Sequence, residues 1–187
     1  MTEAIPDGGT LAELLARQAI TDALHRYCWG IDRGELGLVL SAFHEDARDN
    51  HSGTEERATD RFRRTVVEGG PMRTSHMLTN IHIRVQGNNA VSQACFLASH
   101  QFEHQGEVWN WIINGRYLDR FACRDGDWRI VHRTVVYDME RFESAGRRPI
   151  GHPAEPFFAH AIHGEKSRSD PSFELFTPND HNRQRTA

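Results

Sequence analysis

Two residues far apart in the chain, Asp32 and His76, are the leading candidates for proton-transfer chemistry. Asp32 follows Cys28 by four positions and Leu24 by eight, so its carboxylate lies near the apolar stripe of a predicted helix. A carboxylate there is costly unless it is paired, and at the carboxyl end of a helix the macrodipole makes it more basic. Both features suit a general base or a group that orients one. The alternative is that Asp32 begins a turn and points to water.

His76 lies directly before the first predicted strand. Histidine titrates near neutral pH, and from this position an imidazole can reach a helix carboxylate across a sheet. The competing interpretation is that His76 is one of many bystanders, because the chain has 12 histidines. His100 and His104 share one strand face with Phe102, and we expect them at the surface near a turn rather than in a pocket. They lack a third ligand at recognisable spacing, so no metal site is predicted.

The elements that must position these groups begin with helices. Thr10 and Glu13 form a capping box, and apolar residues then recur at helical spacing until Gly34 stops the helix. A second, short helix is predicted over 36–43, and the polar triplet 44–46 breaks it.

A charged segment follows. Ser52 and Glu55 form a second capping box, which predicts a helix that ends at the Gly-Gly-Pro sequence 69–71. Its arginines alternate with acids, as on a solvated helix face. With a net charge of −4, this pattern argues against a nucleic-acid partner, which requires clustered basic residues.

The second half of the domain is predicted to consist of strands. Alternation over 81–85 indicates the first, and the runs 91–103, 108–123 and 128–139 follow across short turns. Short turns join antiparallel neighbours, so the chain is α+β, helices first and then a twisted antiparallel sheet. Apolar residues on both strand faces predict that one face packs on the helices or lines a cavity. The other is covered, for instance by a second subunit, which favours a homodimer or homotrimer.

Four short motifs, in consistent order and spacing, resemble the SnoaL-like branch of the nuclear-transport-factor-two-like superfamily: residues 27–32, 43–47, 75–80, and Trp128 with Arg133. The resemblance covers about 11–142. It implies a cone-shaped α+β barrel with a curved antiparallel sheet around a long N-terminal helix and a deep apolar cavity. Members include polyketide cyclases, scytalone dehydratase and ketosteroid isomerase-like proteins. No cofactor or metal is implied.

The resemblance also implies site residues. In its dehydratase-like members an Asp at the end of the first helix pairs with a His, and the matching positions here are Asp32 and His76. Tyr27 and Arg133 match further site positions. His76 would abstract a proton, Asp32 would orient it, and Tyr27 or Arg133 would stabilise an enolate or a leaving hydroxyl. Aromatic and aliphatic residues, about half of which can face inward, would hold a small apolar substrate: Phe96, Leu97, Phe102, Trp109 and Trp111.

The function expected is therefore a cofactor-independent lyase or isomerase acting on a steroid-like, terpenoid or aromatic molecule. The alternatives are a non-catalytic ligand-binding cone, or the small subunit of a ring-hydroxylating dioxygenase. An epoxide hydrolase of this fold uses an Asp-Arg-Asp arrangement, which a pairing of Asp32 with a histidine does not match.

The remaining features of the sequence concern its domain boundaries and its cellular location. Residues 1–142 form the cone domain, and 143–187 are expected to form an irregular arm that lies across a partner or over the pocket mouth. No signal peptide and no apolar stretch of about 20 residues is seen, so no membrane association is expected. The three cysteines are expected to be buried thiols, which is typical of a reducing compartment and predicts a cytoplasmic protein.

Overall fold

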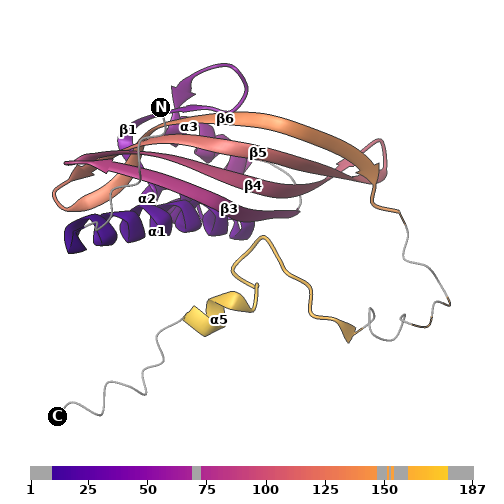
Figure 1. Ribbon diagram of the computed structural model, residues 1–187. Helices are drawn as coiled ribbons and strands as arrows, with labels where there is room; N and C mark the ends of the chain where they lie inside the picture. The colour runs from indigo at the N-terminus through magenta and orange to yellow at the C-terminus, as the bar shows by residue number, and fades with distance from the viewer. Residues whose placement is uncertain (1–9, 69–72, 147–150, 152, 154–159, 177–187) are drawn as a thin grey trace, which may run out of the picture.

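The computed structural model describes residues 10–68, 73–146, 151, 153 and 160–176. A long helix, α1 (Leu11–Arg33), lies under a curved, unclosed six-stranded sheet (Figure 1). The strands stand in the order β2-β1-β6-β5-β4-β3. Their bounds are β1 Phe43–Asn50, β2 Glu56–Arg57, β3 Arg73–Gln86, β4 Asn89–His104, β5 Glu107–Arg124 and β6 Asp127–Ser144. The predicted α+β class is confirmed.

The first helix begins and ends where its sequence signals predict. The backbone N–H of Glu13 donates to the hydroxyl of Thr10, and Gly34 closes the helix with φ +70°, a conformation that favours glycine. The apolar stripe is buried only from Ala16 onward. The first three leucines, Leu11, Leu14 and Leu15, are exposed, so the first turns project past the described core.

The largest departure from the sequence prediction is β1. A second helix, α2 (Leu36–Ser41), forms as expected, but 43–50 is a strand rather than a helix end followed by a polar break. It pairs in parallel with β6, with Asp49 opposite Arg133, so the sheet is mixed rather than purely antiparallel. Its inward positions include Ala47 and Asp49, both buried, and neither residue gives the apolar alternation that marks a strand.

The helix predicted from Ser52 is also shorter than expected. The carboxylate of Glu55 accepts from Arg48 and His132 instead of capping a helix. The chain forms β2 at that point, and the helix α3 (Ala58–Arg63) starts later and continues as a π-helical turn, η1 (Arg64–Glu68). The prediction of a second capping box was therefore wrong, because Arg48 and His132 bind the carboxylate of Glu55.

The strand that carries His76 starts earlier than predicted. β3 begins at Arg73, so His76 lies within the strand and not before it. A bulge between Thr79 and His82, with Asn80 at φ +48°, shifts the register by one residue. This shift keeps the inner face continuous: His76 faces inward before the bulge and Ile83 after it, although one position is even and the other odd.

The antiparallel meander β3-β4-β5-β6 confirms the predicted hairpins, and β6 runs on to Ser144. The three cysteines are free thiols, with Cys28 buried and Cys95 and Cys123 half-buried. Among the described residues, no helix is both long and apolar enough to cross a membrane.

Candidate active site

A cavity of about 300 Å³ is enclosed by α1, α3, the end of β1 and the inner face of β3 to β6. This volume suits a small ligand. Its walls are mainly apolar, and the aromatic or aliphatic side chains include Ile31, Phe62, Phe96, Trp111, Ile113 and Tyr137. Of the aromatic and aliphatic residues expected there, Phe96 and Trp111 line the cavity, whereas Leu97 lines a shallow groove on the outer face of the sheet.

Asp32 and His76 meet at this cavity, as predicted. The Nδ1 atom of His76 lies 2.6 Å from Oδ1 of Asp32, and the backbone N–H of His76 donates to Oδ2 at 2.8 Å. The hydroxyl of Thr74 donates to Oδ1 at 2.8 Å. Because an ionised carboxylate only accepts, the proton of a neutral His76 sits on Nδ1, and the lone pair of Nε2 is available as a base.

The pKa of Asp32 shows which member of the pair can act as the base. Burial pushes this pKa up, but the hydrogen bonds and positive charge of His76 and the bond from Thr74 outweigh burial, and the pKa lies below its ordinary value. The greater basicity expected from the helix end is therefore wrong for Asp32, since the local hydrogen bonds dominate. The carboxylate is suited to orient the imidazole rather than to accept a proton itself.

His100 lines the same cavity, against the expectation of a surface position, whereas His104 is exposed as expected. The Nε2 atoms of His100 and His76 lie 3.3 Å apart. Burial, with the nearby His76, lowers the pKa of His100 to about 4. His100 is therefore neutral at pH 7, and its Nε2 lies within hydrogen-bond reach of Nε2 of His76. His100 shares the inward parity of Phe96 and Ala98 on β4, so strand alternation counted from these apolar residues was the signal that could have placed it in the cavity.

Tyr27 lines the cavity, and its hydroxyl lies 3.2 Å from Nε2 of His51. Burial raises the pKa of Tyr27, so it remains a phenol that can donate. Arg133 lies behind it, fully buried, with its guanidinium 4.2 Å from the centre of the Tyr27 ring and 4.1 Å from that of Tyr117. The guanidinium of Arg133 donates two hydrogen bonds to the carboxylate of Asp119, at 2.8 and 2.7 Å. Arg133 is not among the residues that line the cavity, so its position suits support of the tyrosines.

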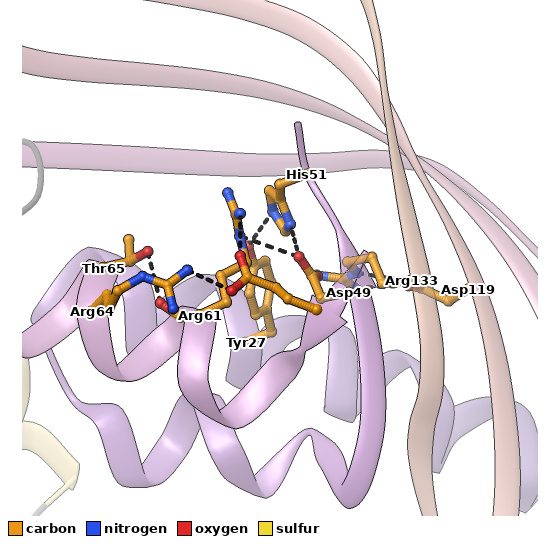
Figure 2. A network of polar contacts seen from close by, with 9 residues as sticks. Tyr27, Asp49, His51, Arg61, Arg64, Thr65, Asp119 and Arg133 are labelled. Atoms are coloured by element: carbon orange, nitrogen blue, oxygen red, sulfur yellow. Dashed lines mark hydrogen bonds and ion pairs between the residues drawn. The ribbon is translucent and has the colours of Figure 1, made fainter. Parts of the chain in front are cut away.

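Sequence reasoning missed a second histidine–carboxylate pair, Asp49 with His51 (Figure 2). Asp49 lies at the end of β1, which the sequence did not predict to be a strand, and His51 is the first residue after it. The only signal was the spacing Asp-x-His, which puts two side chains on one strand face. Among the described residues, no cluster of three or more His, Cys, Asp or Glu is arranged to hold a metal ion.

The fold and the cavity define an α+β domain whose curved sheet packs on a long helix, with a histidine–carboxylate pair beside its pocket. The family model for the SnoaL-like domain matches residues 12–134, so this chain belongs to the SnoaL-like family. No curated protein matches the chain.

Three solved structures illustrate the shared fold. A putative scytalone dehydratase from Novosphingobium aromaticivorans is 23% identical, with a TM-score of 0.61, covering 74% of this chain and 95% of that one. The hexachlorocyclohexane dehydrochlorinase LinA-type3 from Novosphingobium barchaimii is 19% identical, with a TM-score of 0.65 and coverages of 75% and 97%. A nuclear transport factor 2-like superfamily protein from Salmonella enterica is 20% identical, with a TM-score of 0.56, covering 75% of this chain and 98% of that one. At these identities the likeness concerns the fold.

Proposed function

We propose that this protein is a cofactor-independent lyase or isomerase that abstracts a proton from a small apolar substrate. The observation that carries the proposal is the 2.6 Å contact between Asp32 and His76, with His76 lining a largely apolar cavity. Two of the similar structures are named as a putative scytalone dehydratase and a hexachlorocyclohexane dehydrochlorinase, and an oriented base beside a largely apolar pocket supports an elimination of this kind.

The chemistry starts at Nε2 of His76. This atom takes a proton from a carbon of the substrate, and the imidazolium that forms is stabilised by Asp32. The electron pair left on carbon forms a double bond as a leaving group departs, or is protonated at another carbon. Tyr27, held as a phenol, donates a hydrogen bond to the oxygen on which negative charge develops. Arg133 keeps the Tyr27 ring in place from behind.

The experiment is mass spectrometry of hydroxylated steroids, terpenoids and aromatic ketones incubated with the protein in heavy water. Wild type should release water from one class or introduce deuterium into it. Asp32→Asn and His76→Gln should lower this rate by about 10²- to 10⁴-fold, the usual contribution of a positioned base.

The matched control is His104→Gln, which removes an exposed histidine from the same sheet and should leave the rate unchanged. Equal rates in wild type and His76→Gln would refute the proposed base. Binding of a ligand without turnover, unaltered in Asp32→Asn, would instead indicate the ligand-binding cone.

Two further expectations belong to this proposal. The outer part of β6 exposes Met139 and Phe142, at 65% and 54%, which supports a homodimer or homotrimer that light scattering would reveal. The cytoplasmic location follows from the unpaired cysteines and is tested by cell fractionation.

A further inference from the structure

The second histidine of the cavity, His51, is built like the first. Its Nδ1 lies 2.5 Å from Oδ1 of Asp49, a carboxylate with no exposed surface that also pairs with Nε of Arg61 at 3.1 Å (Figure 2). An ionised carboxylate only accepts, so the proton of a neutral His51 is on Nδ1 and the lone pair is on Nε2. That lone pair meets the hydroxyl of Tyr27 at 3.2 Å, and both side chains line the cavity.

Burial and the two nearby arginines keep the His51 ring neutral. Burial is the largest influence and lowers the pKa of His51, Arg61 on α3 and Arg133 on β6 lower it further, and Asp49 on its own strand raises it in part. Tyr27 on α1 and Tyr117 on β5 also face His51, both phenols whose pKa values burial raises, and His100 on β4 lines the same cavity. At pH 7 His51 is therefore a proton acceptor, and Asp49 is in place to stabilise the imidazolium that forms when it accepts.

We propose that Asp49, His51 and Tyr27 form a second proton-transfer site that binds and deprotonates an acidic hydroxyl, a phenol or an enol, on the substrate. This inference rests on the proposed function and narrows its substrate class. The bound hydroxyl oxygen lies between the two side chains, donating to Nε2 of His51 and accepting from Tyr27, in place of their direct contact.

Because His51 accepts a hydrogen bond and Tyr27 donates one, the pair selects a hydroxyl group on the substrate. A hydroxyl can satisfy both, whereas a ketone offers no proton to His51 and a carboxylate or phosphate brings only acceptors. The proton transfer is balanced within the pair. The O–H bond breaks, the proton goes to Nε2, and the oxygen keeps the electron pair as a phenolate or enolate that accepts the Tyr27 hydrogen bond. The walls formed by Phe62, Phe96 and Trp111 fit the ring that carries such a hydroxyl.

The test uses para-nitrophenol, because its phenol and phenolate forms absorb at different wavelengths. It is titrated into the full-length protein at a pH below the pKa of the free probe. Wild type should raise the phenolate fraction of the bound probe by about tenfold over free solution, equal to one pKa unit. His51→Gln should abolish that increase, and His76→Gln should retain it. His104→Gln serves as the control, with thermal unfolding to confirm that each variant is folded.

A second variant, Tyr27→Phe, tests the site independently in case His51→Gln does not fold. Tyr27→Phe removes the donor and leaves the base, so it should give an intermediate phenolate fraction. Loss of the increase in His76→Gln but not in His51→Gln would place the hydroxyl at the first pair and overturn the proposal. Absence of the increase in wild type, or its persistence in His51→Gln, would also overturn it. The readout does not depend on turnover, so it remains separate from the rate loss that tests His76.

Discussion

At the scale of residues, the cavity concentrates three imidazoles, those of His51, His76 and His100, that differ in their surroundings. His76 and His51 each have a buried carboxylate beside Nδ1, whereas the contacts of His100 include Nε2 of His76 and the ring of Trp111. A carboxylate stabilises an imidazolium and a second imidazole does not. His76 and His51 are therefore the residues fitted to accept protons, and His100 is fitted to donate a hydrogen bond.

The neutral histidines make stability depend on pH. The pKa of His100 in the folded protein is about 4 and that of His51 is also lowered, both mainly by burial. Between these values and the ordinary pKa of about 6.5, the unfolded chain binds more protons than the folded one. Stability should therefore be fully present above about pH 6.5 and fall on acidification, by up to about 1.4 kcal/mol per pH unit for each group.

Urea unfolding between neutral pH and pH 4 measures this dependence. His100→Gln should flatten it by removing one of the two groups, while His104→Gln, at an exposed site, should keep the wild-type slope. The lowered pKa of Asp32 adds a loss of stability only below its ordinary value of 3.8. A slope in His100→Gln equal to that of wild type would contradict the assignment.

At the scale of elements, the bulge in β3 determines where the candidate base points. Asn80 holds φ +48°, and the extra residue reverses the inward parity between His76 and Ile83. Asparagine tolerates this backbone region, whereas a β-branched residue does not. The bulge therefore depends on the residue type at one exposed position.

Asn80→Val should lower the free energy of unfolding by about 1–2 kcal/mol, because the left-handed conformation is strained for a β-branched side chain. Asn80→Gly is the matched control and should cost less than about 1 kcal/mol. Chemical denaturation gives both values. If the valine variant were as stable as the glycine variant, the bulge would not require a positive φ.

At the scale of the whole molecule, part of the C-terminal arm returns to the cavity. Arg33 at the end of α1 pairs with Asp170 at 3.0 Å and donates to the backbone oxygen of Glu165 at 2.9 Å. Lys166, between them, lines the cavity. The short helix α5 (Ser172–Phe176) follows on the α1 side of the sheet (Figure 1). The sequence expectation that the arm lies over the pocket mouth is consistent with these contacts.

Arg33→Gln should loosen this attachment. We expect amide hydrogen exchange over residues 160–176 to rise by about tenfold, equivalent to about 1.4 kcal/mol of local stability. Arg168→Gln is the control: its pair with Glu35 is more exposed, with the Arg168 side chain at 78%, and such pairs contribute little. Equal exchange in both variants would mean that apolar contacts hold the segment.

The sequence by itself determined the features that depend on local chemistry. The capping threonine and Gly34 set the first helix and short turns set the hairpins of the meander, because these signals lie within a few residues of the feature they define. The pairing of Asp32 with His76, which are 44 residues apart, was suggested by the family resemblance. Only the tertiary structure decided the rest. A parallel pairing with β6 made a strand of 43–50, the bulge at Asn80 kept His76 and Ile83 on one inner face, and the assembled sheet placed His51, His76 and His100 around one cavity. These outcomes depend on partners distant in the sequence, and a one-residue shift in register reverses the face of every side chain beyond it.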